Sequence, residues 1–113
     1  QWRNDKAAVT GKFATVTSPL SADTLTLTYA ATPNSSVYAV ESPDAIEPAD
    51  PCAYTAFRYP ENNKSAGIVF GGNATDHWRS IVLAVPFETI IETPRRTKLM
   101  QMILNYLLQP AAF

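Results

Sequence analysis

Few side chains in this chain could perform acid–base or nucleophilic chemistry. The sequence contains one histidine, His77, and one cysteine, Cys52, beside ten acidic residues. Asp76 precedes His77, but adjacent residues of a strand point to opposite faces, so this carboxylate is poorly placed to orient the imidazole. We therefore assign no catalytic residue and keep Glu88 and His77 as the candidates for a carboxylate and base pair.

Cys52 is the residue to consider for thiol or metal chemistry. With no second cysteine in the sequence it cannot form an intrachain disulfide, and a small packed thiol is the simplest interpretation. A metal site needs three or four converging ligands, and one histidine with one cysteine gives no such spacing. The sequence predicts no metal and no other cofactor.

Aromatic side chains are the candidates for ligand binding. A group of exposed rings can stack against a sugar, and the residues considered for such a platform are Trp2, Trp78, Tyr54 and Tyr59. Aromatic residues scattered over several strands more often belong to a core or an interface. A polysaccharide is therefore one candidate partner, held open beside a purely structural use of these rings.

Composition excludes several other classes of function. The 113 residues suffice for one domain, and 46% hydrophobic with 17% charged residues is typical of a packed globular chain. Nine basic against ten acidic residues give a net charge of −1, with no basic run longer than Arg95-Arg96. We expect no nucleic-acid binding. No apolar stretch approaches the roughly 18 residues that span a bilayer, so we expect no membrane span.

The elements that must position these residues are mostly strands. Alternating polar and apolar residues predict a hairpin made of strands 12–17 and 24–29. Further strands are expected at 37–40, 53–59, 66–70 and 77–85, with 66–70 inside the sheet because it is apolar on both faces. Residues 45–51 are expected to form a loop, since Pro48 and Pro51 interrupt it.

A helix is expected from Thr93 to Gln109. Thr93 is a suitable N-cap and Pro94 suits the first helical position. Its apolar residues recur at helical spacing and predict one face laid on the sheet: Leu99, Met100, Ile103, Tyr106 and Leu107. The predicted fold class is α+β, a mostly antiparallel sheet of about six strands with one C-terminal helix packed on a face.

The segment Val85-Pro86-Phe87-Glu88-Thr89-Ile90 lies between the last strand and this helix. It resembles the end of a glutamine-amidotransferase-like domain, where a Phe-His-Pro-Glu-Ser-Ile turn supplies a catalytic histidine and glutamate. The glutamate position is kept as Glu88, whereas Pro86 stands where the histidine should be. Cys52 also lacks the flanking glycines of that family's Gly-x-Cys-x-Gly nucleophile elbow. The resemblance implies that the general base is missing.

A closer resemblance is to the amidotransferase-like domain near the C-terminus of secreted bacterial proteins labelled xanthan lyase-like or amidase-like. It covers roughly Tyr38 to Leu108, and the matching segments in order are 40–48, 57–59, 65–68, 86–90, 96–100 and 103–104. One departure is Ala84-Val85, where that group usually has Gly-Phe. The resemblance implies that residues 1–113 form a single domain that is the C-terminal portion of a larger one, with a secreted or periplasmic location and the rest of the parent protein as a partner.

Three functions are left open by the sequence. The first is a non-catalytic accessory or structural module of a secreted bacterial protein. The second is a carbohydrate-binding module that uses exposed aromatics, and the third is an enzyme domain that acts through Glu88 and His77. If a covering segment has been removed, a sheet edge or the side of the helix near Tyr106 is expected to pair with a second copy, giving a homodimer.

Overall fold

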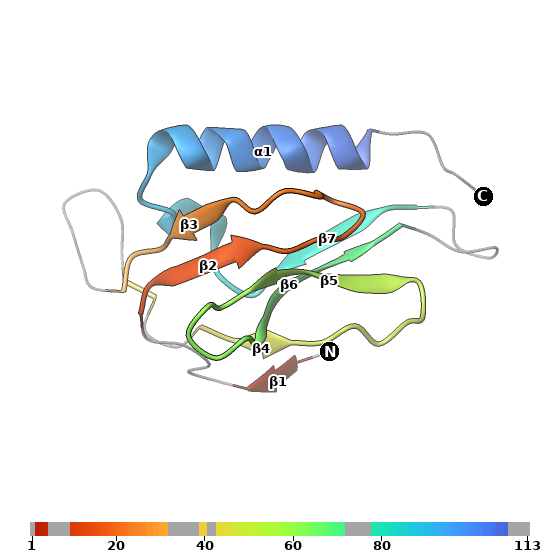
Figure 1. Ribbon diagram of the computed structural model, residues 1–113, viewed down its shortest axis with the longest axis horizontal. Coiled ribbons are helices and arrows are strands. Elements are labelled where there is room, and N and C mark those ends of the chain that lie inside the picture. Colours follow the sequence, from red (N-terminus) through yellow and green to blue (C-terminus); the bar gives the residue numbers. More distant parts are fainter. Residues whose placement is uncertain (1, 5–9, 32–38, 41–42, 72–77, 109–113) are drawn as a thin grey trace.

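The computed structural model describes residues 2–4, 10–31, 39–40, 43–71 and 78–108. Its main element is a five-stranded antiparallel sheet in the order β3-β2-β5-β6-β7 (Figure 1). The strands are β2 (Lys12–Thr15), β3 (Thr26–Thr28), β5 (Ala53–Arg58), β6 (Ser65–Phe70) and β7 (Ser80–Leu83). A short 3-10 helix, η1 (Phe87–Thr89), leads into the helix α1 (Thr93–Leu107).

The sheet lies between two other layers. The helix α1 covers one face, and a two-stranded antiparallel ribbon of β1 (Trp2–Asn4) and β4 (Ala45–Ile46) lies on the opposite side, with β4 close to β6 (Figure 1). The α+β class with one C-terminal helix is therefore confirmed. The sheet under the helix has five strands, and the two remaining strands form their own ribbon.

The predicted hairpin is confirmed. Phe13 of β2 lies opposite Leu27 of β3, and both side chains are completely buried. The side chain of Thr15 closes the turn between the strands: its hydroxyl accepts the N–H of Leu25 at 2.7 Å and donates to the carbonyl of Asp23 at 2.9 Å. The backbone N–H of Thr15 also donates to the carbonyl of Leu25 at 3.0 Å, so the buried threonine side chain adds to the backbone pairing where the two strands separate.

Three predicted boundaries were wrong. Residues 37 and 38 lie outside the described residues, and residues 39–40 are not in a strand. The expected loop 45–51 begins with β4, because Pro48 and Pro51 lie beyond it and leave the first two amide donors available to β1. The last strand covers 80–83 rather than 77–85, since Pro86 and η1 end the extended backbone.

The N-cap of the helix lies one residue before the predicted one. Glu92 occupies the N-cap position, no side-chain hydrogen bond caps the helix, and Thr93 is its first residue. The Glu92 carboxylate instead accepts the backbone N–H of Thr28 in β3 at 3.1 Å. The helix ends at Leu107, with Leu108 as its C-cap, while Gln109 lies outside the described residues. A tertiary contact to β3 therefore outweighs the local cap.

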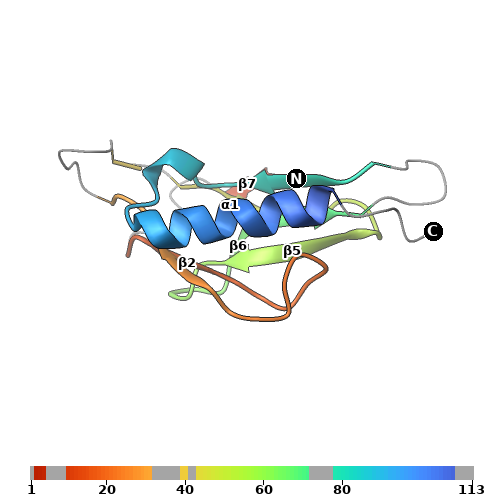
Figure 2. The ribbon, with the colours of Figure 1, turned by 90° about the horizontal axis from the view of Figure 1, so that it is seen from above.

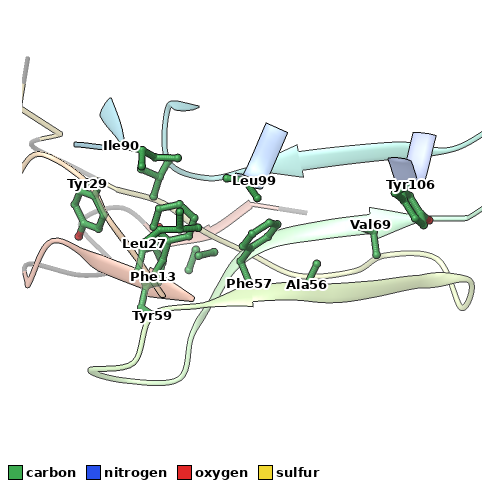
Figure 3. Close-up of a cluster of buried hydrophobic side chains, with 13 residues drawn as sticks. Phe13, Leu27, Tyr29, Ala56, Phe57, Tyr59, Val69, Ile90, Leu99 and Tyr106 are labelled. Carbon is green, nitrogen blue, oxygen red and sulfur yellow. The ribbon is translucent and has the colours of Figure 1, made fainter. Parts of the chain in front are cut away.

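The core lies between α1 and the sheet (Figure 3). Leu99 points from the helix toward Phe57, whose ring lies 5.8 Å from that of Phe13. Gly67 of β6 provides the room for this ring, because a Cβ at that position would lie 2.6 Å from Cδ2 of Phe57. At the other end of the helix, Tyr106 points toward β6 near Val69 (Figure 3).

Leu99 makes the helix contact that most directly tests this packing. It is completely buried, whereas Leu104 on the outer side of α1 is 47% exposed. We expect Leu99→Ala to lower the free energy of unfolding by about 2–5 kcal/mol, through lost apolar contact and the cavity left behind. Leu104→Ala is the matched control and should change it by about 0.5 kcal/mol or less. Equal denaturation midpoints for the two variants would contradict the docking of α1.

Three buried tyrosines should make the fold sensitive to alkali. Burial raises the pKa of Tyr29, Tyr59 and Tyr106 above the ordinary value. Above about pH 10 the unfolded chain releases phenolic protons that the folded chain keeps, so stability is complete below that pH and falls as the pH rises. Each proton contributes a slope of about 1.4 kcal/mol per pH unit.

The measurement is denaturant unfolding followed from neutral to strongly alkaline pH. Tyr59→Phe removes one buried phenol and should make the alkaline decline shallower, even if it lowers stability at neutral pH. A free energy of unfolding that stays level above about pH 10 would rule out this role of the tyrosines.

Candidate functional site

The catalytic pair considered from the sequence is not assembled in the part of the chain that the structure describes. Glu88 is exposed on η1, between β7 and α1. His77 lies outside the described residues. Among the described residues, no group of three or more His, Cys, Asp and Glu side chains could hold a metal ion.

Pro86 occupies the position where the family resemblance would place a histidine. It precedes η1 with φ −59° and ψ 129°, and it is exposed. Its carbonyl accepts the hydroxyl of Thr89 at 2.6 Å and the N–H of the same residue at 3.1 Å. The residue thus holds the turn through its backbone, and its side chain offers no atom that can accept a proton.

The four aromatic candidates do not form one platform. Tyr59 must be removed from the set, because its ring is completely buried and its hydroxyl donates to the carbonyl of Asp44. Nothing is described of the Trp2 side chain. Tyr54 and Trp78 are 51% and 49% exposed.

These two exposed rings lie on different sides of the sheet. Tyr54 lies opposite Val69, whose side chain faces α1 (Figure 3). Trp78 packs edge-to-face on Phe70, with ring centroids 5.2 Å apart. Because Val69 and Phe70 are neighbours in β6, their side chains point to opposite faces, so Tyr54 and Trp78 cannot share a flat ligand.

Cys52 and the polar hollow beside β5 complete the survey of polar sites. Cys52 is half-buried, and its N–H donates to the Asp50 carboxylate at 2.7 Å, which fixes the turn before β5. A hollow of about 320 Å³ lies near the turn after β5, lined by Glu47, Pro48, Thr55, Arg58, Asn63, Lys64 and Ser65. Its Arg58 guanidinium donates to the carbonyl of Asn63 at 2.7 Å and so is used by the turn itself.

The outer edge of β3 is closed by the chain segment that precedes α1. Ile91 N–H donates to the carbonyl of Thr28 at 2.9 Å, and Ala30 N–H donates to the carbonyl of Thr89 at 2.9 Å. Arg95 donates to the carbonyl of Thr26 at 2.6 Å, and Glu92 accepts the N–H of Thr28. This edge has little backbone left for another strand.

The outer edge of β7 is different. Among the described residues, β7 pairs with β6 alone. Ala84 N–H donates to the carbonyl of Ala66 in β6 at 2.9 Å, and bonding directions alternate along an antiparallel strand. The N–H and C=O groups of Ile81 and Leu83 therefore point away from β6, toward an edge with no described strand beside it.

An apolar groove of about 510 Å³ lies between this edge strand and the helix. Seen from above, α1 runs alongside β7 at the border of the sheet (Figure 2). The groove is lined by Ile81, Leu83, Val85, Phe87, Met100, Ile103 and Leu107, with Arg79, Ser80 and Pro86. Arg79 is the single charged residue among these, and its guanidinium lies 4.9 Å over the ring of Tyr106.

The helix carries an exposed apolar flank of Met100, Leu104 and Leu107, of which Met100 and Leu107 line the groove. These side chains are 37%, 47% and 38% exposed. Met100 and Leu107 were expected on the face laid on the sheet, but only Leu99 and Tyr106 are buried in α1. The available signal was the width of the apolar stripe together with the lack of any charged residue from Leu99 to Leu108.

Further observations concern membranes and known proteins. No helix in the described part of the chain is both long enough and apolar enough to cross a bilayer. No protein-family model, curated protein or solved structure matches this chain.

Proposed function

We propose that this chain is a non-catalytic accessory module of a secreted bacterial protein, and that it binds protein by accepting an extended strand at the edge of β7. One observation carries the proposal. In the described part of the chain the edge of β7 is unpaired and uncharged and lies beside an apolar groove under the exposed flank of α1, whereas residues 89–95 close the other edge of the sheet.

The geometry of an added strand matches what is exposed. Neighbouring strands lie about 4.8 Å apart, so a strand beside β7 would lie just beyond the border of the sheet, next to the groove. Its backbone would pair with the outward groups of Ile81 and Leu83. Every second side chain would point toward α1 and cover Met100 and Leu107. Strand addition gives affinity through the backbone and specificity through such alternate side chains.

The sequence of β7 lacks the charges, prolines and bulges that protect many edge strands. The strand Ser80-Ile81-Val82-Leu83 contains no charge and no proline, and its pairing with β6 runs without a bulge. Exposed edges that stay unpaired are usually protected by lysine, proline or irregular backbone. This supports a strand whose edge is covered in the assembled protein.

The non-catalytic part of the proposal follows from Pro86 at the histidine position of the family that the chain resembles. The secreted, bacterial setting also comes from that resemblance. We expect the isolated chain to turn over neither glutamine nor an anionic polysaccharide, because Pro86 stands at that turn in place of the histidine base. Turnover that disappears in Glu88→Ala, while the circular dichroism spectrum is unchanged, would contradict a non-catalytic role.

Amide hydrogen exchange tests the open edge directly. In a dilute sample the amides of Ile81 and Leu83 should exchange quickly, because they face away from β6. The amide of Val82 faces β6 and should exchange more slowly, which makes it the internal control. Slow exchange at Ile81 and Leu83 in a dilute monomer would mean that the edge is already covered, and the proposed function would then fail.

A further inference from the structure

We propose that the strand added to β7 is β7 of a second copy of this chain, so that the module forms a two-fold symmetric dimer through one continuous sheet. This inference rests on the proposed function, because it names the occupant of the same edge. The register, the charge and the size of the surface on each copy support this dimer.

The register follows from which backbone groups point outward. Two opposite residues of an antiparallel pair exchange two hydrogen bonds only if the N–H and C=O groups of both point toward the other strand. Ile81 and Leu83 are the outward residues of β7. Placing Ile81 of one copy opposite Leu83 of the other gives hydrogen-bond partners to the outward groups of both residues. Symmetry repeats this pair, with Leu83 of the first copy opposite Ile81 of the second. Val82 then lies opposite Val82 on the two-fold axis.

Val82 has the exposure that this axis requires. Its side chain is 52% exposed and faces away from α1, because its neighbours Ile81 and Leu83 line the groove on the helix side. Val82 opposite Val82 would be a non-hydrogen-bonded pair, in which the two Cα atoms lie about 4.5 Å apart. The two valines would therefore cover each other on the face of the sheet opposite α1.

Charge does not oppose this pairing. In the same register Arg79 lies opposite Val85 of the second copy, so like charges do not meet across the ladder. Both helices lie on the same face of the joined sheet, and their exposed flanks approach from opposite sides over the two copies of β7. Met100, Leu104 and Leu107 of each copy then face an apolar surface instead of water.

The size of the surface is sufficient for a specific but weak dimer. Residues 79–85 span about 23 Å as a strand, and a sheet with a helix on it is about 20 Å high. The contact is therefore roughly 900 Å² for the two copies together, close to the lower limit of specific interfaces. We expect a dissociation constant in the micromolar range.

Charge-swap variants at the axis test the inference by sedimentation equilibrium. Val82→Lys and Val82→Glu each place like charges against one another only in this symmetric register, so each alone should associate at least about tenfold more weakly than the parent chain. An equal mixture should recover association as a heterodimer. Val82→Thr and Ile91→Lys, the latter at the closed β3 edge, are controls that should leave the dissociation constant within about threefold of the parent.

Two results would overturn the inference. One is a dimer whose stability does not change in Val82→Lys and Val82→Glu. The other is a parent chain that stays monomeric at about 100 µM, well above a micromolar dissociation constant. A monomer with fast exchange at Ile81 and Leu83 leaves the edge open to a strand of another protein, including the rest of a parent chain. A monomer with slow exchange there removes the proposed function as well.

Discussion

The backbone at the two edges of the central sheet is the constraint on which the rest of this structure depends. Each edge strand carries N–H and C=O groups that must find partners in the protein, in water or in another chain. Residues 89–95 close the edge at β3 through two backbone hydrogen bonds and the side chains of Glu92 and Arg95. The same segment starts α1, so closing one edge also fixes where the helix begins.

The position of α1 follows from its two ends. Its first turn is held at β3 through Glu92 and Arg95, and its last turn is held near β7 by Arg79 over the ring of Tyr106. Leu99 and Tyr106 fill the space above the sheet between these ends. A single helix covers only part of a five-stranded sheet, and the border at β7 is one of the parts that it leaves uncovered. The apolar flank of α1 is thus a consequence of how the helix is anchored.

Much of the fold could be predicted from the sequence, because the relevant patterns are local. Alternation in 12–17 and 24–29 gave the hairpin, and the apolar run at 66–70 gave an interior strand. The β1–β4 ribbon was missed because a pairing of two and three residues far apart in sequence leaves no periodic signal. The N-cap was misplaced because Glu92 contacts Thr28, which lies 64 residues away.

The candidate site was harder to predict, because it depends on contacts between residues that lie far apart in the sequence. Tyr54 and Tyr59 are the same residue type and lie close together in the sequence, yet Tyr54 is exposed and Tyr59 is in the core. Tyr59 lies just beyond β5, and its hydroxyl donates to the carbonyl of Asp44, which is distant in the sequence. The open edge of β7 depends on strand order, which no local pattern states. The absence of charge from Leu99 to Leu108 was the available sign that the helix has a second apolar side.

We propose above all that the edge of β7 pairs with another strand. The most direct measurement is an isotope-filtered NOE experiment on a concentrated equal mixture of labelled and unlabelled chain, which detects only contacts between different copies. We expect contacts between the two Val82 side chains and between Ile81 and Leu83 of different copies. Intermolecular contacts confined to residues away from β7 and the α1 flank would contradict it.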